Sequence, residues 1–251
     1  MVRLLVSVVD AEEAAAALAG GAHIVDVKNP AEGALGAPAP AVVRAIRRAL
    51  PGRVALSVAL GDLPDLPGTA ALAAVGAASL GADYVKVGLR GPGDAEAAGR
   101  LLAAVAAALR DLAPGVRLIA CAYADGPRVG AVDPLDVPAA AAAAGCAGAM
   151  VDTLHKGAGG LFAHMTDARA RAFVEACRRH GLTSALAGSL TPADLPRVAA
   201  LGPDIAGVRG AACTGGDRLG GRIDPGRVRA LVSALAGVVS GAGGTVSGVR
   251  R

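Results

Sequence analysis

The sequence predicts a single (β/α)8 barrel, also called a TIM barrel. Its 251 residues match the usual length of one such barrel, and 53% of them are hydrophobic against 18% charged, so the chain can bury a large core. Short runs of β-branched residues alternate with Ala- and Leu-rich segments of helical periodicity, at a spacing of roughly 30 residues. A strand, a helix and a strand repeated in this way indicate a closed parallel sheet surrounded by helices.

Eight strands and eight helices are expected in alternation. The expected strands span residues 3–7, 23–28, 54–59, 84–88, 116–121, 149–153, 183–187 and 205–208. The expected helices span residues 11–19, 39–50, 69–80, 95–112, 138–144, 167–180, 192–201 and 225–235. Cap residues support these boundaries, since Asp10 precedes the first helix with Glu13 three residues on, and Thr191-Pro192 opens the seventh.

The barrel is expected to form one domain over residues 1–236, and the Gly/Ser/Val-rich residues 237–251 are expected to form a flexible tail. An open doubly wound sheet is the alternative architecture. It would need a glycine-rich dinucleotide-binding loop after its first strand. The sequence from Ser7 to Asp10 reads SVVD, which is no such loop, so the closed barrel is favoured.

Composition and charge favour a small anionic ligand over a nucleic acid or a membrane. The net charge is +4 with the basic residues scattered, and aromatic residues make up only 2% of the chain. No apolar stretch has the length of a membrane span or the form of a signal peptide, which predicts a soluble, cytoplasmic protein, and a homo-oligomer is compatible with the sequence. The cysteines lack metal or disulfide spacing and are interpreted as small buried thiols. They are Cys121, Cys146, Cys177 and Cys213.

The lysines stand out because arginine is the dominant basic residue. Of the 25 basic residues, 22 are Arg and only Lys28, Lys86 and Lys156 are Lys. A guanidinium stays protonated at any working pH, whereas a lysine amine can lose its proton and attack a carbonyl carbon. Each lysine kept in so arginine-rich a chain is therefore a candidate for chemistry that arginine cannot perform.

All three lysines are expected at the carboxyl ends of strands, where TIM barrels hold their active sites. Because alternate residues of a strand share a face, Asp26 and Lys28 point together toward the barrel, as does Lys86 from its own strand. Asp152 ends the sixth strand, and Lys156 lies four residues further on. The alternative is a set of solvated surface lysines, with the aspartates acting as structural partners of arginines.

The predicted cluster favours amine chemistry. Ammonium groups that share one partly desolvated mouth lower one another's pKa, while the two carboxylates limit the total charge. One lysine can then be neutral near pH 7 and form a Schiff base with an aldehyde or ketone. A second lysine with a carboxylate can move protons.

The other half of the mouth is expected to bind phosphate. Loops after the seventh and eighth strands hold phosphate in many TIM barrels, and here their small residues expose backbone N–H groups. The predicted phosphate ligands are Gly188, Ser189, Arg209 and Gly210. The glycine-rich segment 215–218 is interpreted as a flexible loop first and a lid second. His155 can reach the mouth, whereas His23, His164 and His180 are interpreted as incidental.

Several motifs together resemble the (5-formylfuran-3-yl)methyl phosphate synthase family. They are VDVKNPAEGALGA, ADYVKVGL, YAD with VGAVDP, MVDTLHKG, ALAGSLTPADLP and GVRGAACTGGDR. The resemblance runs from Leu4 to about Leu235. It implies a TIM barrel that condenses two glyceraldehyde 3-phosphate molecules to a furan aldehyde phosphate, with loss of phosphate and water and without a metal or organic cofactor.

The resemblance also implies residue roles. Lys28, in DVKNP, corresponds to the Schiff-base lysine and Lys86, in YVKVG, to the proton acceptor. Asp26, Asp152 and Lys156 correspond to supporting charged residues. The chain departs from the family pattern in the Gly-rich stretch 155–165 and in an apolar stretch at 56–59, which leaves substrate details open. Its Ala/Arg-rich composition indicates a high-GC bacterium, so the furan can serve a bacterial pathway instead of methanofuran synthesis.

Two other functions remain open at this point. A class I aldolase of the deoxyribose-phosphate type shares the barrel, the Schiff-base lysine and the phosphate loops, but its product is not a furan. A non-catalytic phosphate-sugar binder shares the phosphate loops alone. It would form no covalent adduct on a lysine.

Overall fold

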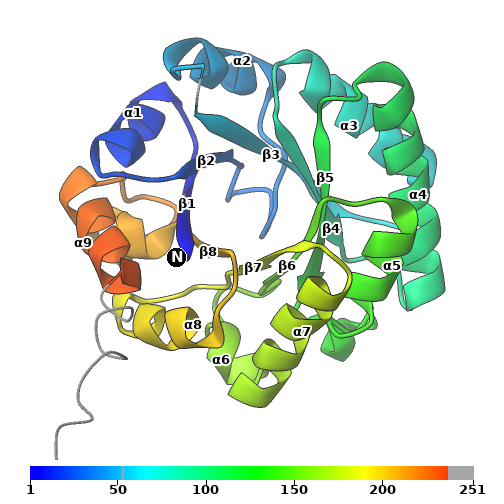
Figure 1. Cartoon of the computed structure of the whole chain (residues 1–251). Coiled ribbons are helices and arrows are strands. Elements are labelled where there is room, and N and C mark those ends of the chain that lie inside the picture. The colour runs from blue at the N-terminus through cyan, green and yellow to red at the C-terminus, as the bar shows by residue number, and fades with distance from the viewer. Residues whose placement is uncertain (53, 237–251) are drawn as a thin grey trace, which may run out of the picture.

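The computed structural model describes residues 1–52 and 54–236 and contains a closed barrel of parallel strands in the order β1 to β8 (Figure 1). The strands are β1 Arg3–Val8, β2 Ile24–Val27, β3 Ala55–Leu63, β4 Tyr84–Leu89, β5 Arg117–Tyr123, β6 Gly148–Asp152, β7 Thr183–Leu186 and β8 Ile205–Val208. The predicted TIM barrel is confirmed as one domain. The predicted tail, residues 237–251, lies outside the described residues.

Helices surround this barrel on its outer side (Figure 1). They are α1 Ala11–Ala19, α2 Pro40–Ala49, α3 Pro67–Ser79, α4 Ala95–Leu112, α5 Val137–Ala144, α6 Leu161–His164, α7 Asp167–Arg179, α8 Leu195–Leu201 and α9 Pro225–Ala236. Several helices have a side-chain N-cap. The side chains of Asp10, Asp94 and Thr166 each accept a hydrogen bond from a backbone N–H in the first turn of the helix that follows. Among the described residues, no helix is long and apolar enough to cross a membrane.

Alternation along the strands separates two apolar layers. Val85 and Val87 face outward and pack under the helices. Leu5, Met150 and Ile205 belong to a second cluster that fills the barrel interior. Because this interior is packed, the open space lies at the carboxyl ends of the strands, where charged side chains replace the apolar ones.

Two local features differ from the expected elements. β3 runs to Leu63 instead of ending at residue 59, because an irregularity between Ala59 and Asp62 carries the strand past Gly61. The short helix α6 was not expected within the Gly-rich stretch 155–165. The longer β3 brings Asp62 to the barrel mouth, where it contacts Ala34 and Tyr123.

Candidate active site

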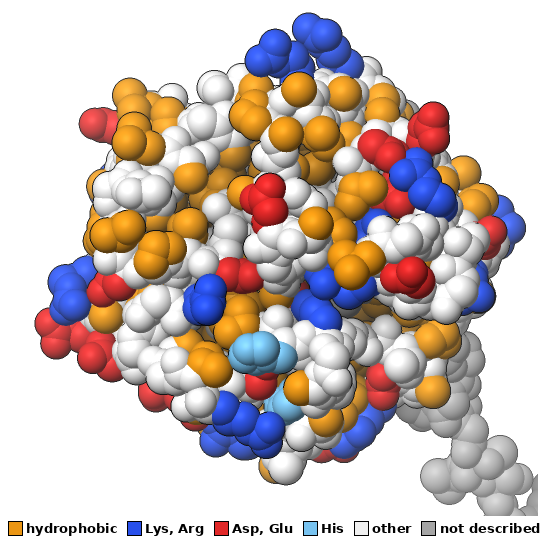
Figure 2. All heavy atoms as spheres, turned by 180° about the vertical axis from the view of Figure 1, so that it is seen from behind, with side chains coloured by type: hydrophobic (Ala, Val, Ile, Leu, Met, Phe, Trp, Pro, Cys, Tyr) orange, Lys and Arg blue, Asp and Glu red, His pale blue; other side chains and the backbone are white. Residues whose placement is uncertain are grey.

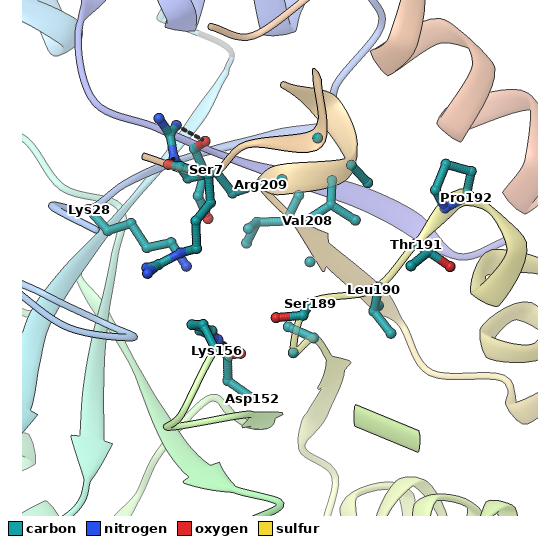
Figure 3. A pocket seen from close by; sticks show the side chains of 18 of the residues that line it. Ser7, Lys28, Asp152, Lys156, Ser189, Leu190, Thr191, Pro192, Val208 and Arg209 are labelled. Carbon is teal, nitrogen blue, oxygen red and sulfur yellow. Dashed lines mark hydrogen bonds and ion pairs between the residues drawn. The ribbon is translucent and has the colours of Figure 1, made fainter. Parts of the chain in front are cut away.

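A cavity of about 480 Å³ opens at the carboxyl ends of the strands, and the predicted lysines line it together. Lys28, Lys86 and Lys156 face it from β2, β4 and the loop after β6. Seen from the side opposite to Figure 1, charged side chains gather around a central hollow (Figure 2). Lys28 and Lys156 lie on the same side of this space, with the Lys156 amine turned to Asp152 and with Ser189 across from them (Figure 3).

Lys28 is buried, with 6% of its surface exposed, and forms no ion pair within 4.0 Å among the described residues. Its Nζ donates to the carbonyl oxygen of Ala34 at 3.1 Å. The pKa of Lys28 is lowered to about 8, chiefly by burial, with Asp152 opposing this effect and the ammonium groups of Lys156 and Lys86 adding to it. The amine is therefore partly neutral near physiological pH.

Lys86 differs from Lys28 in having a direct carboxylate partner. Its Nζ lies 2.7 Å from Asp26 Oδ2, and this oxygen also accepts from Ser7 Oγ at 2.8 Å. Burial disfavours the ammonium form, but the Asp26 carboxylate outweighs this effect and raises the pKa of Lys86 above its usual value. Lys86 therefore rests as an ammonium ion, while the second oxygen of Asp26 is buried without a hydrogen-bond partner in the described chain.

Asp152 and Lys156 form the second ion pair of the mouth. Lys156 Nζ lies 2.5 Å from Asp152 Oδ1 and 3.3 Å from the hydroxyl of Thr153. Burial alone would raise the pKa of Asp152, but Lys156 and Lys28 lower it to about 2. The carboxylate therefore stays ionised and offsets part of the positive charge around Lys28.

A strap formed by residues 29–36, after β2, lies across the lysine half of the mouth, and Asp62 holds it in place. The Asp62 carboxylate accepts the backbone N–H groups of Ala34 and Leu35 at 2.8 and 3.1 Å, and it also accepts the hydroxyl of buried Tyr123. A side chain at Gly33 would collide with Asp62, so the strap needs glycine there.

This strap explains how Lys28 is oriented, and sequence reasoning did not find it. Ala34, whose carbonyl oxygen holds the Lys28 amine, is fixed by Asp62. The segment around Asp62 reads as a turn after a short strand, because Gly61 precedes it and Pro64 follows. The irregularity in β3 places the Asp62 carboxylate at the mouth. The hydrophobic pattern of the sequence does not indicate this irregularity.

The other half of the mouth is formed largely by the backbone of the loop after β7. Gly188 has φ +110°, and a Cβ there would lie 2.9 Å from Thr153 Cγ2. Ser189 has φ +47° and is the one non-glycine residue with positive φ among residues 1–52 and 54–236. Non-glycine residues in this region indicate backbone that the surrounding structure holds in place, often at functional sites. Gly188, Ser189 and Gly210 all line the cavity, and their role as phosphate ligands stays a prediction.

Arg209 lines the cavity too, but its guanidinium is already engaged. It pairs with buried Glu13 at 2.8 Å and donates to the carbonyl oxygens of Ser7 and Arg218 at 3.0 and 2.7 Å. These contacts engage most of the guanidinium N–H groups, and its contact with phosphate stays a prediction. The structure shows Arg209 joining the ends of β1 and β8 and supporting the segment that carries Arg218.

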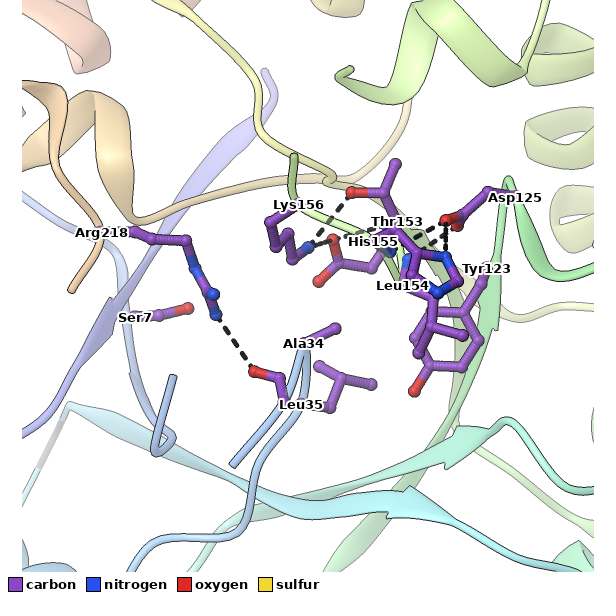
Figure 4. A network of polar contacts seen from close by, with 12 residues as sticks. Ser7, Ala34, Leu35, Tyr123, Asp125, Thr153, Leu154, His155, Lys156 and Arg218 are labelled. Carbon is purple, nitrogen blue, oxygen red and sulfur yellow. Dashed lines mark hydrogen bonds and ion pairs between the residues drawn. The ribbon is translucent and has the colours of Figure 1, made fainter. Parts of the chain in front are cut away.

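His155 lies beside the mouth but does not line the cavity. Its side chain is 57% exposed, and Nδ1 lies 3.0 Å from Asp125 Oδ2, which also accepts the backbone N–H of His155 (Figure 4). All four cysteines are buried, as expected of small thiols. Within the described part of the chain, no cluster of three or more His, Cys, Asp or Glu side chains has the arrangement of a metal site.

The fold and the charged mouth define the class of protein, which is an enzyme built on a TIM barrel. Comparison with known proteins gives the family. A model of the family described as 4-HFC-P synthase matches residues 4–232, and the chain belongs to this family. The family expected from the sequence motifs is thereby confirmed.

Relatives from archaea match nearly the whole chain. It is 48% identical over 234 residues to the (5-formylfuran-3-yl)methyl phosphate synthase of Methanopyrus kandleri, covering 93% of this chain and 99% of that protein. It is 49% identical over 228 residues to the enzyme of the same name from Methanocaldococcus jannaschii, covering 91% and 97%.

Solved structures of lower identity share the fold alone. KGPDC from Streptococcus mutans superposes with a TM-score of 0.65 at 14% identity, covering 95% of this chain and 99% of that chain. The 3-hexulose-6-phosphate synthase of Salmonella typhimurium gives a TM-score of 0.61 at 16% identity, covering 94% and 99%. Both superpositions extend over the whole barrel.

Proposed function

We propose that the protein condenses two molecules of glyceraldehyde 3-phosphate to (5-formylfuran-3-yl)methyl phosphate through a Schiff base on Lys28. The observation that carries this proposal is the Lys28 amine, which faces the cavity with a pKa of about 8 and no carboxylate in contact. The product is the one named for relatives nearly half identical to this chain. A cytoplasmic location and a homo-oligomer stay predictions.

Lys28 acts as the nucleophile in this proposal. With a pKa of about 8, about one tenth of the amine is neutral at pH 7, compared with less than about one thousandth for an ordinary lysine. The Ala34 carbonyl oxygen accepts one hydrogen of this amine, which orients the nitrogen within the cavity. Lys28 is therefore better prepared than Lys86 or Lys156 to attack an aldehyde, because each of these is ion-paired.

Lys86 acts as the proton carrier. Because it rests as an ammonium ion beside Asp26, it first donates a proton to the hydroxyl group that leaves as water when the imine forms. The neutral Lys86 amine then accepts a proton from the carbon next to the imine. Acid and base roles thus follow each other on one nitrogen, and Asp26 stabilises the protonated state.

The net reaction balances without an oxidant or a reductant. Two triose phosphates lose one phosphoric acid and two water molecules and give the furan aldehyde phosphate. In the triose bound to Lys28, the phosphate oxygen is attached to the carbon two bonds from the imine carbon. Loss of the intervening proton therefore places an electron pair where it can expel phosphate.

The phosphate that stays in the product is assigned to the backbone of the β7 and β8 loops. The N–H groups of Gly188, Ser189 and Gly210 are the proposed donors, with the Ser189 hydroxyl as an additional one. Arg209 is proposed to hold the β8 end in place, because its own guanidinium is paired with Glu13.

Incubation with glyceraldehyde 3-phosphate tests the proposed function. The expected result is release of one phosphate for each furan formed, measured together by a phosphate assay and by near-ultraviolet absorbance. An aldolase would give a product without furan absorbance. A binding protein would give neither signal and no adduct after borohydride treatment, so either result would exclude the synthase activity.

A further inference from the structure

The guanidinium of Arg218 forms a second positively charged site for an anion at the mouth. This site is separate from the backbone loops after β7 and β8. Arg218 lines the cavity, and none of its nitrogen atoms is ion-paired within 4.0 Å among the described residues. Nη2 donates to the carbonyl oxygen of Gly33 at 3.1 Å, so the remaining guanidinium N–H groups are free of carboxylates. The side chain extends over the mouth opposite Lys156 (Figure 4).

The position of Arg218 is built into the fold. Its carbonyl oxygen accepts Nε of Arg209 at 2.7 Å, and Arg209 is itself anchored by the buried ion pair with Glu13. Burial lowers the pKa of Arg218, and Asp152 is the charged group that most opposes this effect. The backbone of Arg218 is fixed by Arg209, and its guanidinium is partly desolvated over the cavity. Such a group can bind an anion, because its planar N–H donors fit a phosphate group.

The strap connects Arg218 with Lys28. Lys28 Nζ donates to the carbonyl oxygen of Ala34 and Arg218 Nη2 to that of Gly33, both at 3.1 Å. Because Gly33 and Ala34 are neighbours along the chain, the two side-chain nitrogens lie at most about 11 Å apart. A triose phosphate joined to the Lys28 nitrogen extends about 7 Å to its outer oxygens, so one further hydrogen bond of about 3 Å brings the guanidinium within its range.

We propose that Arg218 binds the phosphate of the triose attached to Lys28 and stabilises it as it leaves. The proton on the carbon next to the imine passes to Lys86, the resulting electron pair forms a carbon–carbon double bond, and the carbon–oxygen bond to phosphate breaks. The bonding pair leaves on the phosphate oxygen, where the guanidinium neutralises part of the charge. This inference rests on the proposed function and assigns separate sites to the two phosphates.

Single-turnover measurements on Arg218→Gln with glyceraldehyde 3-phosphate test the assignment. Phosphate release should slow by about 10²-fold, the effect of removing one transition-state donor. Borohydride trapping on Lys28 should fall by less than about threefold, because the imine forms without this side chain. The trapped peptide should carry a phosphate-bearing triose. Arg218→Lys, which keeps the charge, should be intermediate, with a loss of about tenfold.

Arg222→Gln is the matched control. Arg222 lies on the same loop but pairs with Asp10 and Glu12, with a longer contact of 3.7 Å to Glu13, and it does not line the cavity. Phosphate release by this variant should stay within about twofold of the parent. If Arg218→Gln released phosphate at the parent rate, or if Arg222→Gln were equally slow, the assignment would be wrong.

Two readouts separate this inference from the proposed function. If the parent formed no furan and released no phosphate, the proposed function would fail, whatever the variants did. Titration with inorganic phosphate, followed by calorimetry, needs no turnover. The parent should bind phosphate at two sites, and Arg218→Gln should lose one of them while retaining the site of the β7 and β8 loops. Retention of both sites would overturn the assignment.

Discussion

The two halves of the barrel mouth are built in different ways. The half formed by β2, β4 and β6 presents charged side chains, with Asp26 beside Lys86 and Asp152 beside Lys156. The half formed by the β7 and β8 loops presents backbone, shaped by the positive φ angles of Gly188 and Ser189. In the first half residue identity determines the chemistry, whereas in the second the backbone conformation does.

Within the lysine half, a second contrast separates Lys28, the proposed nucleophile, from Lys86, the proposed proton carrier. Lys28 and Lys86 are both buried, but a carboxylate touches only Lys86. The pKa of Lys28 falls to about 8, whereas that of Lys86 rises. Two side chains of one type therefore acquire opposite pKa shifts because their neighbours differ.

The largest effect is expected for Lys28→Arg. A guanidinium retains the charge but cannot form the imine, so furan formation and borohydride trapping should both disappear. The barrel should still fold, because the substitution lies at the open end. Absorbance and mass spectrometry measure the losses, and circular dichroism checks folding. Activity within about tenfold of the parent would refute the nucleophile assignment.

Lys86→Arg should have the next largest effect. The guanidinium still pairs with Asp26 but cannot cycle between acid and base, so turnover should fall by roughly 10² to 10⁴-fold. Trapping of substrate on Lys28 should persist. If trapping disappeared as well, the division of roles between the two lysines would be incorrect.

Substitutions in the glycine half should separate backbone from side chain. Gly188→Ala places a methyl group against Thr153 at φ +110°, so we expect KM for the triose phosphate to rise by about 10- to 100-fold. Ser189→Ala removes only the hydroxyl, and KM should change by less than about threefold. Equal effects of the two substitutions would contradict binding through the backbone. Steady-state kinetics on both variants decides the matter.

The smallest effects should appear in the pH profile. For the parent, the rate of borohydride trapping of substrate on Lys28 at low substrate concentration should rise about tenfold per pH unit below pH 8. It should level off above pH 8, because the pKa of Lys28 is about 8. Lys156→Met removes a positive charge that lowers this pKa, so the rise should move to higher pH. Asp152→Asn removes a negative charge that raises it, so the rise should move to lower pH. Shifts in the same direction would contradict the electrostatic account.

The sequence was most informative where residue identity matters. Strand parity and the scarcity of lysine placed Lys28, Lys86 and Lys156 at one mouth, and the structure brings them together there. The alternating elements likewise predicted the closed barrel, because each strand and helix carries its own periodicity.

The parts that sequence reasoning missed depend on long-range contacts. Asp62 reaches the mouth through an irregularity in β3, and its contact with Tyr123 joins residues 61 positions apart. Glu13 pairs with the guanidinium of Arg209 from 196 positions away, and nothing in the sequence around β8 signals this contact. Arg218 was included only in a loop of unknown role, since nothing local shows that it extends over the cavity.

Identification of the residue that becomes covalently attached to substrate tests the central claim most directly. The parent enzyme would be incubated with glyceraldehyde 3-phosphate and borohydride at pH 8, digested, and analysed by peptide mass spectrometry. A triose-derived mass is expected on Lys28, with Lys86 and Lys156 unmodified. A label on Lys86 or Lys156 with Lys28 unmodified would contradict it.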